Sequence, residues 1–283
     1  MNKKLYNFLL ILLAIIFLLS GWKLFSYFHE GKKTQNRYDE LAAIVAQDRA
    51  TENSGSPTTT AEQERTTENP DDQPGPANPS TPTEPATEPE DDGMLPEFRR
   101  LYEANQDLVG WIEIEDTVIN YPVVQTPEDP EYYLHRDFDG SDNARGCLFA
   151  DWKCDVENSD NVIIYGHHMN DGSMFASLME YTSKKYWQEH PEIRFDTLTE
   201  RRTYEIFAVF RTTASIGQGF RYNQFTDAAD QAEFDNFVAK CKSLSVYDTG
   251  IIPEYGEKLI CLSTCEYTRE NGRFVVMGVY RPE

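Results

Sequence analysis

The chain has 283 residues, and 26 Lys and Arg against 48 Asp and Glu give a formal charge of −22 at neutral pH. A polyanionic partner such as DNA or RNA is therefore disfavoured. Aromatic residues make up 13% of the chain, which favours a folded, β-rich unit over a disordered chain. Five Cys are an odd number without tight spacing, so a disulfide framework is not expected.

The N-terminal segment, residues 1–33, is predicted to be a membrane anchor. Residues 8–19 are all apolar, and residues 5–22 have about the length of the roughly 20-residue helix that crosses a bilayer. Basic residues lie on both sides, so orientation is inferred from the N-terminal position, which indicates a signal-anchor with a cytoplasmic N-terminus and the remaining chain outside the cell. A cleaved signal is the alternative, but residues 18–22 make a poor cleavage site. Trp22 stands where a lipoprotein would need a Cys.

Two segments of different character follow the anchor. Residues 34–50 carry Tyr38, Leu41, Ile44 and Val45 at helical spacing, which predicts a short amphipathic helix acting as a stalk or as a brace against the globular domain. Residues 51–93 hold 8 of the 15 Pro and 11 acidic residues against a single Arg. This composition predicts a disordered, acidic, Pro/Thr-rich linker, a tether whose extended form reaches on the order of 100 Å from the bilayer.

Residues 94–283 are predicted to form the globular domain. A helix is expected over residues 96–106, after which the hydrophobic period changes to that of short strands. Seven β-branched or aromatic runs are typical of a barrel or sandwich, and the predicted fold is mainly β, a barrel decorated by helices. The expected strands are residues 111–114, 118–124, 162–165, 193–195, 204–211, 259–264 and 274–280, and the expected helices are residues 174–181, 183–190 and 227–245.

Two strand ends carry the residues that are best suited to catalysis. His167 follows one apolar strand, Cys265 ends another, and Arg273 opens the next strand. A thiolate attacks a carbonyl and a nearby imidazole protonates the departing amine, so a Cys/His pair fits thiol acyl transfer. A guanidinium in this position would stabilise the tetrahedral oxyanion.

Each of these residues also has a simpler interpretation. Arg273 alone is a surface charge, and most lone cysteines are small core hydrophobes, as expected for Cys147, Cys154, Cys241 and Cys261. Four residues along one strand separate the Cα atoms of Cys261 and Cys265 by about 13 Å, too far for a disulfide. The His167-His168 doublet could indicate a metal site, but adjacent strand residues face opposite ways and no further ligand spacing completes a set, so neither metal nor cofactor is expected.

At these residues the chain resembles the class B sortases, the membrane-tethered cysteine transpeptidases of Gram-positive bacteria. The resemblance runs from about Phe98 to Tyr280 and rests on several motifs in the family's order. They are DLVGWI (107–112), YPVVQ (121–125), YYL (132–134), GCLFAD (146–151), YGHHM (165–169), GSMF (172–175), LSTC (262–265) and RFVV (273–276).

The resemblance implies an eight-stranded β-barrel with an added helix between strands. It also implies Cys265 as the nucleophile, His167 as the general acid and base, and Arg273 as the cation at the oxyanion or substrate. Residues implied near the bound peptide are Ser263, Thr264, Tyr165, Leu134 and Glu266. Two departures put local contacts in doubt: Cys261 stands where the family usually has Thr, and residues 129–131 read Asp-Pro-Glu where an Asn is common.

The expected function is therefore that of a sortase B-type transpeptidase. Family analogy implies cleavage after Thr in a C-terminal sorting motif of the Asn-Pro-x-Thr type on secreted proteins. The acyl group would pass to an amine of a peptidoglycan precursor, or to a pilin Lys if the enzyme builds pili. A tethered cysteine peptidase and a non-catalytic surface-binding domain are the alternatives.

Overall fold

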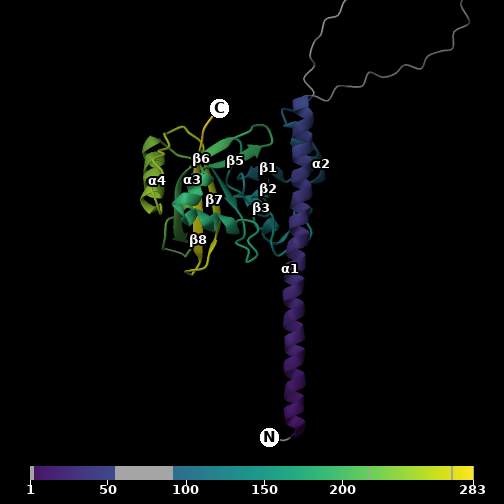
Figure 1. The fold of residues 1–283 in the computed structure, drawn as a ribbon. Coiled ribbons are helices and arrows are strands. Elements are labelled where there is room, and N and C mark those ends of the chain that lie inside the picture. Colours follow the sequence, from purple (N-terminus) through teal and green to yellow (C-terminus); the bar gives the residue numbers. More distant parts are fainter. Residues whose placement is uncertain (1–2, 55–91, 216, 269, 283) are drawn as a thin grey trace, which may run out of the picture.

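The computed structural model describes residues 3–54, 92–215, 217–268 and 270–282. Within these ranges, eight strands close into a barrel in the order β1-β2-β3-β4-β7-β8-β6-β5 (Figure 1). β2 with β3 and β4 with β7 pair in parallel, and the other neighbours are antiparallel. The strands are β1 (Leu108–Glu113), β2 (Asn120–Val124), β3 (Leu148–Ala150), β4 (Asn161–Tyr165), β5 (Glu192–Thr197), β6 (Thr203–Thr213), β7 (Leu259–Glu266) and β8 (Gly272–Tyr280).

The eight-stranded sortase barrel expected from the resemblance is confirmed. Hydrophobic periodicity alone predicted seven of these strands. It missed β3, because a run of three residues is too short to show an alternation.

The sheet formed by β4, β7, β8 and β6 is buried on both faces. Alternate residues of β7, such as Ile260 and Leu262, point into the barrel core, whereas Cys261 belongs to a second apolar cluster on the outer face. That cluster is covered by α4 (Gln231–Leu244). Asp230 caps the N-terminus of α4, since its side chain accepts a hydrogen bond from the Glu233 backbone N–H. A side chain on the outer face of β7, at the end of the strand, therefore lies outside the barrel, beside the second apolar cluster.

Three shorter helices lie close to predicted positions: α2 (Pro96–Ala104), the 3₁₀ turn η2 (Ala176–Thr182) and α3 (Lys184–Glu189). Two further 3₁₀ turns, η1 (Tyr132–His135) and η3 (Tyr222–Gln224), were not predicted. The helix expected over residues 174–181 is 3₁₀ rather than α and starts later. Met174 adopts a left-handed backbone conformation, with φ at 57°, which a helix does not accommodate.

The N-terminal part is a single helix, α1 (Lys3–Ser54), rather than an anchor followed by a separate amphipathic helix. No Pro interrupts residues 3–54, so the helix continues past the apolar segment. Its buried positions, Gly31, Thr34, Tyr38, Leu41 and Val45, recur every three or four residues and pack against the barrel. Residues 51–54, expected to start the linker, belong to α1, and residues 55–91 of that linker lie outside the described residues.

Hydrogen bonds and ion pairs fix α1 on the barrel. The Tyr38 hydroxyl donates to the Gly146 carbonyl at 3.0 Å, and Arg49 pairs with the buried carboxylates of Glu97 and Asp196 at 3.2 and 2.7 Å. Among the described elements, α1 is also the helix that is long and apolar enough to cross a membrane.

Candidate active site

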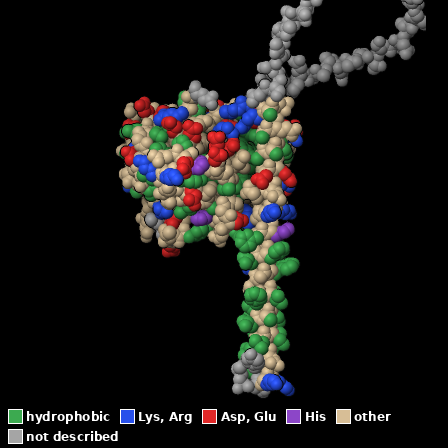
Figure 2. Space-filling view, in the orientation of Figure 1, with side chains coloured by type: hydrophobic (Ala, Val, Ile, Leu, Met, Phe, Trp, Pro, Cys, Tyr) green, Lys and Arg blue, Asp and Glu red, His purple; other side chains and the backbone are tan. Residues whose placement is uncertain are grey.

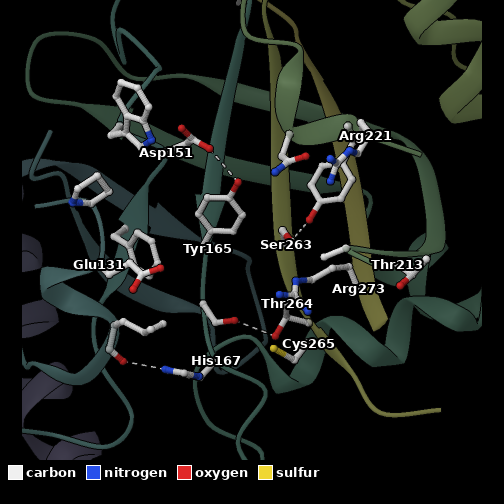
Figure 3. A pocket seen from close by; sticks show the side chains of 18 of the residues that line it. Glu131, Asp151, Tyr165, His167, Thr213, Arg221, Ser263, Thr264, Cys265 and Arg273 are labelled. Carbon is white, nitrogen blue, oxygen red and sulfur yellow. Dashed lines mark hydrogen bonds between the residues drawn. The ribbon is translucent and has the colours of Figure 1, made fainter. Parts of the chain in front are cut away.

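A cavity of about 390 Å³ opens where β4 and β7 end, on the outer face of the barrel (Figure 3). Its walls come from the loop before β3, from the residues after β4, and from the loop between β6 and α4. The predicted residues that line it are Leu134, Tyr165, His167, Ser263, Thr264, Cys265 and Arg273.

Cys265 and Arg273 are direct partners across the antiparallel pair of β7 and β8. Because directly opposed residues share a face, both side chains emerge on the outer face, and Figure 3 shows them at one side of the cavity. Cys265 is partly exposed, whereas the other four cysteines are buried. The Arg273 guanidinium donates to the Gly272 carbonyl at 2.9 Å, which holds the side chain near its own strand.

His167 lies two residues after the end of β4 and lines the opposite side of the cavity. Its Nε2 donates to the Leu134 carbonyl at 2.8 Å, and its ring stacks on His135 with centroids 5.7 Å apart. A carbonyl only accepts, so this bond keeps the proton on Nε2 and leaves Nδ1 as the acceptor nitrogen. Gly166 is required before it, because a Cβ there would lie 2.4 Å from Leu148 and 2.7 Å from Phe175.

The neighbouring His168 points elsewhere and does not line the cavity. Its Nδ1 donates to the backbone carbonyl of Cys265 at 3.0 Å, and its ring packs against Tyr267 at 5.1 Å. The expectation that adjacent histidines face opposite ways agrees with this geometry. The bond to Cys265 was not foreseen, and it links His168 to the main chain of the nucleophile candidate.

The other predicted residues divide into two groups. Ser263 shares a 2.6 Å hydrogen bond with the Tyr222 hydroxyl, and Thr264 donates to the Gly166 carbonyl at 2.8 Å. Glu266 lies away from the cavity, on the inner face of β7. It is 2% exposed, faces Arg211 at 3.8 Å, and accepts hydrogen bonds from Thr268. Strand alternation turns Glu266 to the face opposite Cys265. Thr264, one residue before Cys265, also faces that way but still reaches the cavity.

Several wall residues were not predicted as site residues. Asp151 accepts a hydrogen bond from Tyr165 at 2.9 Å, and Trp152, Phe220, Arg221 and Tyr222 complete the far end of the cavity. Burial raises the pKa of Tyr165 and the nearby Asp151 carboxylate adds to the rise, so the phenol stays a neutral donor. Residues 217–225, which include η3, have no repeating sequence pattern, and the sequence offers no signal for their place in the wall beyond their aromatic residues.

Within the described ranges, no group of three His, Cys, Asp or Glu side chains is placed to bind a metal ion. All five cysteines are unpaired. The Cys261 thiol, where the family usually has Thr, packs in the second apolar cluster and does not reach the cavity.

Comparisons with known proteins agree with this architecture. The sortase domain model matches residues 112–280. Sortase B of Listeria monocytogenes is 32% identical over 266 residues, which cover 93% of this chain and 91% of that protein. The chain belongs to the sortase B family. Sortase B of Staphylococcus aureus is 30% identical over 65% of this chain and 75% of that protein.

Solved structures of sortase B have the same fold. Sortase B from Bacillus anthracis, in complex with AAEK1, superposes with a TM-score of 0.66 and 30% identity, covering 90% of this chain and all of that one. The Staphylococcus aureus sortase B–substrate complex has a TM-score of 0.69 and 24% identity over 89% of this chain and 98% of that one. The protein is thus a cysteine transpeptidase of the sortase B type.

Proposed function

We propose that this sortase cleaves a C-terminal sorting motif of secreted proteins after Thr and transfers the acyl group to a cell-wall amine. The observation that carries the proposal is the Cys265–Arg273 pair at the mouth of a cavity whose other side holds His167. These three side chains supply the nucleophile, the cation and the proton carrier that acyl transfer requires.

The reaction follows from this placement. The Cys265 thiolate attacks the carbonyl carbon after the motif Thr, and Arg273 stabilises the oxyanion that forms. His167, as imidazolium, gives a proton to the departing nitrogen when the C–N bond breaks, which leaves a thioester on Cys265. An acceptor amine then attacks the thioester and gives a proton to His167 as the C–S bond breaks, so thiolate and imidazolium are restored.

The chemistry of the cavity fits an extended peptide. Leu134, Phe149, Trp152 and Phe220 give apolar wall, while Tyr222 and Ser263 place hydroxyl groups in its interior. This mixture suits an apolar or Pro-containing motif whose backbone and amide side chain need hydrogen-bond partners. An Asn-Pro-x-Thr-type motif is the proposed substrate. Residues 129–131 read Asp-Pro-Glu where an Asn is common in the family, and Pro130 and Glu131 lie in the cavity wall. Contacts with the peptide at that edge are therefore specific to this chain.

The acceptor is proposed to be a peptidoglycan precursor amine outside the cell. This location requires α1 to cross the membrane with its N-terminus in the cytoplasm. The exposed apolar side chains of α1, which extend from Leu5 to Phe28, support it.

The test uses the full chain in detergent with a motif peptide, followed by mass spectrometry. We expect a thioester adduct on Cys265, and amide products with a stem-peptide amine in preference to a lysine side chain. Cys265→Ser should form no thioester, and Cys261→Thr is the matched control on the same strand face, expected to keep full activity. Hydrolysis alone in the presence of amines would favour a peptidase, and preference for lysine would favour pilin assembly.

A further inference from the structure

The apolar surface of α1 ends where the helix reaches the barrel. Large exposed apolar side chains continue along α1 to Phe28, and the next turn already contacts the barrel at the buried Gly31. Figure 2 shows the same transition, with the apolar helix surface ending at the lower edge of the barrel. Thus no free stretch of chain separates the apolar segment from the catalytic domain.

The first contact between α1 and the barrel is a tight one. Arg145, which is 1% exposed, donates to the Tyr27 carbonyl at 3.2 Å and to the Asp171 carboxylate at 2.6 Å. Its guanidinium also lies over the Tyr27 ring at 4.9 Å. Gly31 permits this approach, because a Cβ there would lie 2.4 Å from the guanidinium. The helix is therefore fixed to the barrel one turn after it leaves its apolar segment.

The end of the barrel that lies near Tyr27 is the end that carries Cys265. β7 ends at Glu266, and β8 begins at Gly272; these strand ends lie at the lower edge of the barrel (Figure 1). Tyr267, which follows β7 directly, is 69% exposed. Tyr267 also donates to the His168 carbonyl at 3.3 Å. The cavity mouth and the start of the docked helix thus lie at the same height.

The rise per residue of α1 gives the depth of Tyr27 relative to the bilayer. At 1.5 Å per residue, about 20 residues cross the roughly 30 Å hydrocarbon layer. If that layer begins at Leu5, it ends near Leu24, and Tyr27 lies in the headgroup region. Tyr267 contacts the same loop that holds Arg145 against Tyr27, through its bond to His168, so it lies near this depth too. Tyrosine is one of the residues that favour this interface.

We propose that the barrel end around Tyr267 docks on the outer headgroup layer of the lipid bilayer, so that the cavity beside Cys265 opens at the membrane surface. The inference rests on the proposed membrane insertion of α1. It replaces the picture of a barrel held on a long tether, because α1 reaches the barrel before the linker begins. Asp48 of α1 pairs with Arg100 of α2 at 3.1 Å, so the helices on either side of the linker are held together.

The test measures depth in phosphatidylcholine vesicles that carry nitroxide lipids. Full-length Cys265→Ala protein receives one surface cysteine, labelled with a fluorophore, at Tyr267, at Tyr255 or at Leu13. Tyr255 is the matched control, a 49% exposed tyrosine before the other end of β7. We expect headgroup nitroxide to quench position 267 several-fold more than position 255, and mid-chain nitroxide to quench position 13.

The outcomes separate the docked orientation from the anchor itself. Equal quenching at positions 267 and 255, with position 13 quenched, would overturn the orientation and leave the anchor standing. No quenching at position 13 would overturn both. A five-residue Gly/Ser insertion after Ser26 should abolish the quenching at 267, whereas shortening residues 55–91 should preserve it. Quenching at 267 that survives the insertion but is lost when residues 55–91 are shortened would show that the linker sets the distance of the barrel from the membrane, and would contradict the inference.

Discussion

The hydroxyl groups of Tyr222 and Ser263 lie 2.6 Å apart, although the residues are 41 positions apart in sequence. Ser263 is two residues before Cys265 on the same face of β7, and Tyr222 belongs to η3 in the loop between β6 and α4. The bond therefore fastens this loop, which forms the far wall of the cavity, to the strand of the nucleophile candidate. Burial raises the pKa of Tyr222, so this partner remains a neutral hydroxyl.

A double-mutant cycle measures this bond. Ser263→Ala leaves the buried Tyr222 hydroxyl without its partner, which is expected to cost about 1–3 kcal/mol of unfolding free energy. Adding Tyr222→Phe removes the orphaned group, so the double variant should be no less stable than Ser263→Ala alone. Urea unfolding of the detergent-solubilised chain gives the four values. Additive losses would show that the two hydroxyls do not interact.

The two adjacent histidines should differ strongly in their effect on turnover. His167→Ala removes the proposed proton carrier and is expected to lower kcat by roughly 10²- to 10⁴-fold. His168→Ala removes one hydrogen bond to the Cys265 carbonyl, worth about 1 kcal/mol, so a loss of only about fivefold is expected. His168→Asn, whose amide also donates, should recover part of it. Circular dichroism checks the fold of each variant, and a larger loss for His168→Ala would reverse the assignment.

Arg273→Lys tests whether the guanidinium acts through directed donors or through charge alone. Lysine keeps the charge but lacks the planar set of N–H groups, so we expect kcat to fall by about 100-fold or more. The thioester on Cys265 should then form slowly in single-turnover mass spectrometry. Near-normal turnover with lysine would show that Arg273 is an ordinary surface charge and does not stabilise the oxyanion through directed donors.

Thiol chemistry should distinguish Cys265 from the other cysteines. Burial raises the pKa of Cys154 to about 12 and also raises the pKa of Cys147, Cys241 and Cys261. At pH 8, a thiol-reactive dye should therefore label one site in the native chain, five after denaturation, and none in native Cys265→Ala. More than one native label would contradict the burial described here.

The same thiols predict a dependence of stability on alkaline pH. In the unfolded chain they ionise near the ordinary thiol pKa of 9.0, but in the folded chain they keep their protons. The stabilisation is fully present below pH 9 and is lost as the pH rises toward the raised values. Urea unfolding should show the unfolding free energy falling above about pH 9, with a smaller slope in Cys261→Ala.

Arg145 should be essential for holding α1 on the barrel. Arg145→Met removes the buried guanidinium and its hydrogen bonds to Tyr27 and Asp171, while the charge left on Asp171 is exposed to water. The loss is therefore expected to be about 1.5–3 kcal/mol, as for hydrogen bonds of a charged group, measured by urea unfolding in detergent. Asp171→Asn, which keeps a hydrogen-bond acceptor for Arg145, should cost less. Equal losses would show that the charge of Asp171, not its hydrogen bond, holds the contact.

The sequence predicted the barrel because seven of its strands are β-branched or aromatic runs bounded by polar loops. Strand ends also placed Cys265, His167 and Arg273, since a residue that closes an apolar strand is delivered to the surface. The resemblance implied Glu266 near the bound peptide, but the structure turns its side chain to the face of β7 opposite Cys265, where it is buried and does not line the cavity.

Other features depend on contacts between distant segments and leave no periodic signal. The stacking of His135 on His167 joins η1 to the end of β4, and neither segment indicates the other. The continuity of α1 was missed because its apolar and amphipathic parts have different compositions, although nothing in the chain breaks the helix between them. Arg145 appears as an ordinary loop cation until the fold brings it beneath Tyr27.

The ion pair between Asp48 and Arg100 closes a loop around residues 55–91. The entropy cost of joining two fixed chain ends grows only with the logarithm of the number of residues between them, about 0.6 kcal/mol for each doubling. Changing the length of this 37-residue segment should therefore have little effect on the free energy of unfolding. Insertions here, including a reporter domain, should leave both the barrel and its depth unchanged, and this segment is the natural place for length to drift during evolution.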